Sequence, residues 1–117
     1  MSDNSVYFID SAALDLLLRQ KSVLMIDVRE ADEFTSGTVA GAINTPLGML
    51  DMADLIDRTD DTGLDVVFIC AVGQRSFAVA NAALQHLDCK VMTLKGGFMS
   101  WVRDGYPIEM VGHPGQD

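Results

Sequence analysis

Cys70 is the residue of this chain with the clearest capacity for chemistry. The residues just before it, 66–69, are apolar β-formers, which is typical of a strand buried on both faces of a parallel sheet. A short stretch containing Gly73 then leads into an Ala-rich helical pattern that begins near Ser76. The sequence therefore predicts a thiol at the carboxyl end of a strand and just ahead of a helix, where open α/β folds bind their ligands.

The surroundings predicted for Cys70 favour its anionic form. Unpaired backbone N–H groups and the dipole at a helix amino terminus stabilise an anion, and such a site can lower the pKa of a cysteine from about 8.5 to roughly 3.5–7.5. Gly73 permits the backbone angles of a tight anion-binding loop, and Arg75 adds a fixed positive charge. The alternative is that Cys70 is a small apolar residue that fills space at the strand end.

Several segments resemble, in the right order, the signatures of the rhodanese-homology domain. They are residues 26–30 (Ile-Asp-Val-Arg-Glu), 33–34 and 37–46, the loop from Cys70 to Arg75, and residues 94–98 with Trp101, Gly105 and Pro107. Thr38 stands where the family often has His, at a position that we interpret as structural. The resemblance covers about residues 5–109 and implies a rhodanese-like α/β fold with sulfurtransferase chemistry.

The resemblance implies a two-step reaction at Cys70. The thiolate attacks the outer sulfur of a donor to form a persulfide, and a nucleophilic acceptor then removes that sulfur. The substrate-binding cradle is formed by the backbone N–H groups of Ala71, Val72, Gly73, Gln74 and Arg75, which stabilise charge on sulfur. The donor is thiosulfate or a thiol persulfide, the acceptor is a thiol or a cyanide-like nucleophile, and either can be carried by a protein. No cofactor and no metal are expected.

Two other functions stay open for this loop. Phosphatases related to the rhodanese fold carry one more residue between Cys and Arg, and their wider loop admits phosphate or arsenate. Only six residues run from Cys70 to Arg75 here, which disfavours a phosphatase or an arsenate reductase. The second alternative is a non-catalytic rhodanese-like domain that binds a protein or carries sulfur. Retention of the cysteine favours the enzyme, because inactive relatives usually lose it.

Two roles are open for Arg75 and two for the other cysteine. Arg75 either holds an anionic donor at the rim of the site or braces the loop through an ion pair with Asp27 or Glu30. Cys89 lies at the start of another expected strand. We interpret it as a packing residue, with a resolving thiol as the alternative.

Composition predicts one compact domain over residues 1–117, with a core at about 5–109 and a loose tail at 110–117. The chain is 49% hydrophobic and 21% charged, and its apolar runs are too short for a membrane span. Its first residues do not resemble a secretory signal, so a cytoplasmic location is expected. The net charge of −9 disfavours nucleic acid and anionic membranes and better suits a basic protein partner or a thiol carrier.

Strand and helix patterns alternate along the chain. Strands are expected at residues 6–9, 23–28, 66–69 and 90–94, and helices at 31–34, 50–57, 76–87 and 97–104, with a polar loop at 59–65. A further helix, carrying Leu14, Leu17 and Leu18, begins with Asp10 or Ser11 as its cap. This alternation predicts an α/β fold, namely an open parallel sheet flanked by helices on both faces.

Overall fold

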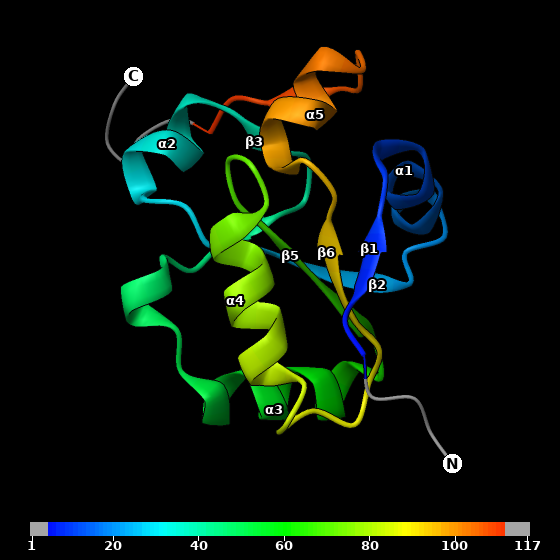
Figure 1. Cartoon of the computed structure of the whole chain (residues 1–117), viewed down its shortest axis with the longest axis vertical. Coiled ribbons are helices and arrows are strands. Elements are labelled where there is room, and N and C mark those ends of the chain that lie inside the picture. Colours follow the sequence, from blue (N-terminus) through cyan, green and yellow to red (C-terminus); the bar gives the residue numbers. More distant parts are fainter. Residues whose placement is uncertain (1–4, 112–117) are drawn as a thin grey trace.

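The computed structural model describes residues 5–111, and its centre is a five-stranded sheet (Figure 1). The strands, in their order across the sheet, are β1 (Tyr7–Ile9), β6 (Val91–Leu94), β5 (Asp65–Ile69), β2 (Val23–Asp27) and β4 (Ile43–Asn44). All neighbouring strands in this sheet run parallel, so the predicted open parallel sheet is confirmed. Most of the tail predicted at 110–117 lies outside the described residues.

Helices cover both faces of the sheet, as the sequence predicts. The longer ones are α1 (Ser11–Arg19), α3 (Met52–Thr62), α4 (Gln74–Ala83) and α5 (Gly97–Arg103). Residues of α3 and α4 pack in one apolar cluster, and residues of α1 and α5 pack in the other. The short elements are α2 (Ala31–Ser36), the 3-10 turn η1 (Leu47–Met49), and β3 (Thr38–Val39), which pairs antiparallel with β7 (Ile108–Glu109).

The central strand β5 supplies side chains to both clusters, which explains its unbroken apolar run. Val66 and Phe68 belong to the cluster of α3 and α4, whereas Val67 and Ile69 belong to the cluster of α1 and α5. None of these four side chains has any exposed surface. Cys70 continues the alternation and lies on the same side of the sheet as α4.

The polar loop predicted at 59–65 is wrong, because α3 continues as far as Thr62. Thr59 is buried, and its hydroxyl donates to the carbonyl of Leu55 at 3.1 Å, so this polar residue is accommodated inside the helix. The helix ends only at Gly63, whose φ of +68° is a left-handed conformation that favours glycine.

The helix predicted at 76–87 is displaced toward the amino terminus. α4 begins at Gln74, directly after Gly73, which adopts a φ of +102° as its cap. The helix ends at Ala83, and Leu84 follows as its cap. Phe77 on this helix is 40% exposed and stacks on Phe8 with ring centroids 5.3 Å apart.

Candidate active site

Cys70 lies directly after β5, at the start of the loop that leads into α4 (Figure 1). The residue has no exposed surface. Its sulfur accepts hydrogen bonds from the backbone N–H of Gly73 at 3.0 Å and of Ser76 at 3.2 Å. The hydroxyl oxygen of Ser76 lies 3.3 Å from the same sulfur. The loop and the first turn of α4 therefore close around Sγ with polar hydrogens.

These donors decide the ionisation of Cys70. Burial raises the pKa of the thiol, but hydrogen bonds from the Ser76 hydroxyl and from the amides of Ser76, Gly73 and Val72 outweigh it, so the pKa lies below its usual range. A lowered pKa means that more of the thiol is present as thiolate at any pH below the ordinary cysteine value. The arrangement thus favours the anionic form of the buried sulfur.

Of the predicted cradle of residues 71–75, the amide of Gly73 donates to the sulfur at 3.0 Å, and the amide of Val72 contributes to the lowered pKa of Cys70. Gly73 lies at its centre, whereas Ser76, which lay outside the predicted set, supplies both an amide and a hydroxyl. The side chain of Val72 is 53% exposed, so only its amide faces the sulfur. Gln74 and Arg75 form the first turn of α4. A Ser following a Cys-to-Arg loop at the start of a helix is the signal by which sequence reasoning could have included Ser76.

The outer side of the loop is held by the first turn of α5. The N–H of Phe98 donates to the carbonyl of Cys70 at 2.8 Å, and the N–H of Met99 donates to the carbonyl of Ala71 at 3.0 Å. Both carbonyls are thereby paired with amides of α5, and the start of the loop is fixed to that helix. This support for the cradle was not predicted from the sequence.

Gly97 is the position that allows α5 to approach the loop so closely. Its φ is +66°, and a Cβ added there would lie 2.5 Å from the carbonyl oxygens of both Cys70 and Ala71. We therefore expect Gly97→Ala to destabilise the protein by roughly 1–3 kcal/mol through backbone strain and to raise the pKa of Cys70 by displacing the loop.

Urea unfolding and a pH titration of Cys70 alkylation measure both effects of Gly97→Ala. Gly48→Ala is the matched control, because no atom lies within 4 Å of the added Cβ and no left-handed φ is required there. If both variants retained the wild-type stability and titration, the close approach of α5 would not support the cradle.

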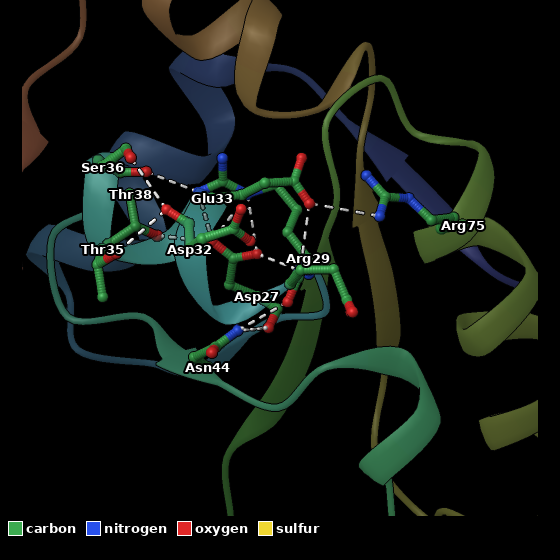
Figure 2. Close-up of polar contacts among 11 residues, drawn as sticks. Asp27, Arg29, Asp32, Glu33, Thr35, Ser36, Thr38, Asn44 and Arg75 are labelled. Carbon is green, nitrogen blue, oxygen red and sulfur yellow. Dashed lines mark hydrogen bonds and ion pairs between the residues drawn. The ribbon is translucent and has the colours of Figure 1, made fainter.

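Arg75 forms an ion pair with neither Asp27 nor Glu30, the two acidic residues predicted as its partners. Its guanidinium lies 3.6 Å from the carboxylate of Glu33, as Figure 2 shows, and both side chains are more than a third exposed. An exposed ion pair of this kind contributes about 0–1 kcal/mol. Glu33 also accepts the N–H of Glu30 at 3.0 Å, as part of the capping box of α2. Arg75 therefore links the start of α4 to α2.

Asp27, which was predicted to pair with Arg75, instead accepts hydrogen bonds from Arg29 and Thr38 (Figure 2). The Arg29 guanidinium donates to Asp27 at 2.8 Å and to the carbonyl of Gly37 at 2.6 Å, and Thr38 donates to Asp27 at 2.8 Å. All three side chains are buried. The Arg29 guanidinium also lies 4.3 Å from the ring centre of Phe98 on α5. This network ties β2 and β3 to the helix that supports the loop.

Cys89 is too distant along the sheet to act on Cys70 directly in this structure. Cys70 follows β5, whereas Cys89 precedes β6, and these strands run parallel, so the two thiols lie at opposite edges. Cys89 is half-buried against the cluster of α3 and α4. Burial, followed by the nearby Asp65 carboxylate, raises the pKa of its thiol, which opposes the reactive form.

A model of the rhodanese-like domain matches residues 10–104. The chain belongs to the rhodanese-like family. The matched region includes β2, β4, β5 and β6 of the sheet, the loop after Cys70 and α5, so the resemblance of the motifs extends to most of the architecture. Among residues 5–111, no helix has both the length and the apolar character needed to cross a bilayer.

Relatives of this rhodanese-like domain include proteins with different names. A sulfurtransferase from Allochromatium vinosum is 31% identical over 101 residues, which cover 86% of this chain and 92% of the relative. The dual specificity phosphatase Cdc25 from Arabidopsis thaliana is 30% identical over 115 residues, covering 89% and 78%. The crystal structure of a rhodanese-related protein from Thermoplasma volcanium superposes with a TM-score of 0.74 at 31% identity, covering 89% and 98%.

Proposed function

We propose that this rhodanese-like domain is a sulfurtransferase whose nucleophile is Cys70. The observation that carries the proposal is the convergence of the Gly73 amide, the Ser76 amide and the Ser76 hydroxyl on a single sulfur atom. Such donors stabilise negative charge on sulfur without a general base. The sulfurtransferase from Allochromatium vinosum, similar along most of both chains, supports the same class of reaction.

The proposed reaction has two displacement steps. With thiosulfate as donor, the Cys70 thiolate attacks the outer sulfur, a new S–S bond forms, the S–S bond of thiosulfate breaks, and sulfite leaves with the electron pair. The persulfide anion then takes the place of the thiolate in the cradle. A nucleophile such as cyanide attacks the outer sulfur, leaves as thiocyanate, and regenerates the Cys70 thiolate. A thiol persulfide can replace thiosulfate, with a thiolate as the leaving group.

Residues 71–75 are proposed to bind the substrate, and the burial of Cys70 limits how the donor reaches the sulfur. Cys70 has no exposed surface, so a donor reaches the sulfur only when the loop from Ala71 to Gly73 moves outward. Arg75 is already paired with Glu33 at 3.6 Å, yet its side chain is 39% exposed and remains accessible to an anionic donor. We propose that residues 5–109 act as one unit, because β7 near the end of this range pairs with β3.

The experiment that tests the function compares sulfur loading with phosphate ester hydrolysis. The protein is incubated separately with thiosulfate and with glutathione persulfide, and its intact mass is measured before and after treatment with cyanide. We expect the gain of one sulfur atom, its removal by cyanide with formation of thiocyanate, and negligible turnover of an aryl phosphate. The reason is that the loop from Cys70 to Arg75 spans six residues, one fewer than in related phosphatases.

Two outcomes would contradict the proposal. Hydrolysis of the phosphate ester without sulfur loading would favour the activity named for the Arabidopsis relative. Neither loading nor hydrolysis, with a folded protein, would favour a rhodanese-like domain that only binds a partner.

A further inference from the structure

A line of buried hydroxyl groups continues inward from the sulfur of Cys70. The hydroxyl oxygen of Ser76 lies 3.3 Å from Sγ and 2.7 Å from the hydroxyl oxygen of Thr93 on β6. Thr93 in turn lies 3.2 Å from the carbonyl oxygen of Phe68, its register partner on β5. None of these four residues has any exposed surface. The line therefore runs from the sulfur into the sheet, screened from solvent.

Each hydroxyl in this line has one hydrogen to donate, so the direction of donation depends on the state of Cys70. When Cys70 is a thiol, it donates to Ser76, Ser76 donates to Thr93, and Thr93 donates to the Phe68 carbonyl. When Cys70 is a thiolate it cannot donate. The line then reverses, with Thr93 donating to Ser76 and Ser76 donating to the sulfur.

We propose that Thr93 is a positioning residue for the Cys70 thiolate. The Thr93 hydroxyl donates to the Ser76 oxygen, so Ser76 can donate its own hydrogen to the sulfur without leaving the Ser76 oxygen unpaired. Ser76 has a competing acceptor, the Gly73 carbonyl, at 3.3 Å. A hydrogen bond to an ionised group is stronger than one between neutral groups. The bond from Ser76 to the thiolate is strengthened further when the Ser76 oxygen itself accepts a hydrogen bond from Thr93. The reversed line therefore stabilises the thiolate more than the forward line stabilises the thiol. This inference rests on the proposed role of Cys70 as nucleophile.

The charged groups around the loop do not depend on Thr93. Arg75 on α4 contacts Glu33 on α2, and Asp27 and Arg29 pair with each other. Lys95, between β6 and α5, is exposed. A substitution at Thr93 leaves all of these groups in place, so a changed titration of Cys70 in such a variant reports on the hydroxyl line.

The test compares Thr93→Val with Thr93→Ser. Val keeps the β-branched shape that suits a buried strand but removes the hydroxyl, whereas Ser keeps the hydroxyl and removes a methyl group. The ultraviolet absorbance of the thiolate is titrated in each protein, with the same protein carrying Cys70→Ser as the blank, which removes the signal of Cys89 and the tyrosines. Thermal melting and circular dichroism establish that each variant is folded.

We expect the wild-type titration to have its midpoint below the ~8.5 of a free cysteine. Thr93→Val should raise that midpoint by roughly 0.5, which reduces the thiolate fraction about threefold at a pH well below the midpoint. Thr93→Ser should titrate like the wild type even if it melts at a lower temperature.

A Thr93→Val titration that matches the wild type would overturn the proposal. So would a Thr93→Ser titration displaced as far as that of Thr93→Val, because the effect would then follow packing rather than the hydroxyl. These results are independent of sulfur transfer, since the absorbance requires no donor. Failure of the proposed function would instead appear as absence of sulfur loading in a wild-type protein whose Cys70 still titrates at low pH.

Discussion

Replacing Cys70 with Ser is expected to abolish sulfur loading and turnover while leaving the fold in place. Serine has nearly the same shape, and its oxygen can accept the hydrogen bonds that Gly73 and Ser76 now donate to sulfur. Its hydroxyl stays protonated at neutral pH and attacks a sulfane sulfur far more weakly than a thiolate does. Intact mass after incubation with thiosulfate or glutathione persulfide, together with thiocyanate release, measures the loss.

Cys89→Ser is the matched control for this experiment, since Cys89 lies at the opposite edge of the sheet and its pKa is raised by burial and by Asp65. We expect this variant to gain sulfur as the wild type does. Retention of the added sulfur in Cys70→Ser, or its location on Cys89 after peptide mapping, would show that the nucleophile has been assigned to the wrong residue.

Replacing Asp27 with Asn is expected to produce the largest loss of stability. Asp27 has no exposed surface and accepts hydrogen bonds from the side chains of Arg29 and Thr38. The substitution leaves the Arg29 guanidinium buried without a counter-charge. Removing one partner of a buried ion pair typically costs about 3–5 kcal/mol, a large part of the roughly 5–15 kcal/mol that stabilises an ordinary domain. Urea unfolding monitored by circular dichroism measures the change.

Asp54→Asn provides a control that removes the same charge from an exposed pair. Asp54 and Arg58 lie one turn apart on α3 at 2.9 Å, and both are more than 40% exposed. Its loss should cost only about 0.3–0.5 kcal/mol. In Asp27→Asn we also expect weaker sulfur loading, because Arg29 packs on Phe98, which supports the loop. Equal losses of stability in the two variants would mean that the buried pair does not hold the fold together.

The parts of the fold that follow from local sequence were predictable. The run at 66–69 is apolar without a break because β5 packs on both sides, and this placed Cys70 at a strand end from the sequence alone. The end of α3 was not predictable in the same way. Asp60 and Asp61 resemble loop residues, yet they lie on the exposed side of a helix whose buried side carries Thr59.

The parts of the site that depend on distant segments were missed. The ion pair of Arg75 joins α4 to Glu33 on α2, and no local pattern distinguishes Glu33 from Glu30 as its partner. Likewise, the hydroxyl of Thr93 meets Ser76 only because β6 lies beside β5 in the sheet. A period of two along a strand predicts which side chains are buried, but it does not say which of them touch across elements.

The contact between α5 and the loop has a consequence for the folding of the chain during its synthesis. Residues 66–76 leave the ribosome well before residues 97–99, yet the carbonyls of Cys70 and Ala71 are held by the amides of Phe98 and Met99. A nascent chain that ends before α5 therefore lacks the two amides that hold these carbonyls. The loop that we propose as the site is thus complete only once residues 97–99 have been made and α5 has packed on it, so a polypeptide truncated before α5 is expected to lack the native surroundings of Cys70.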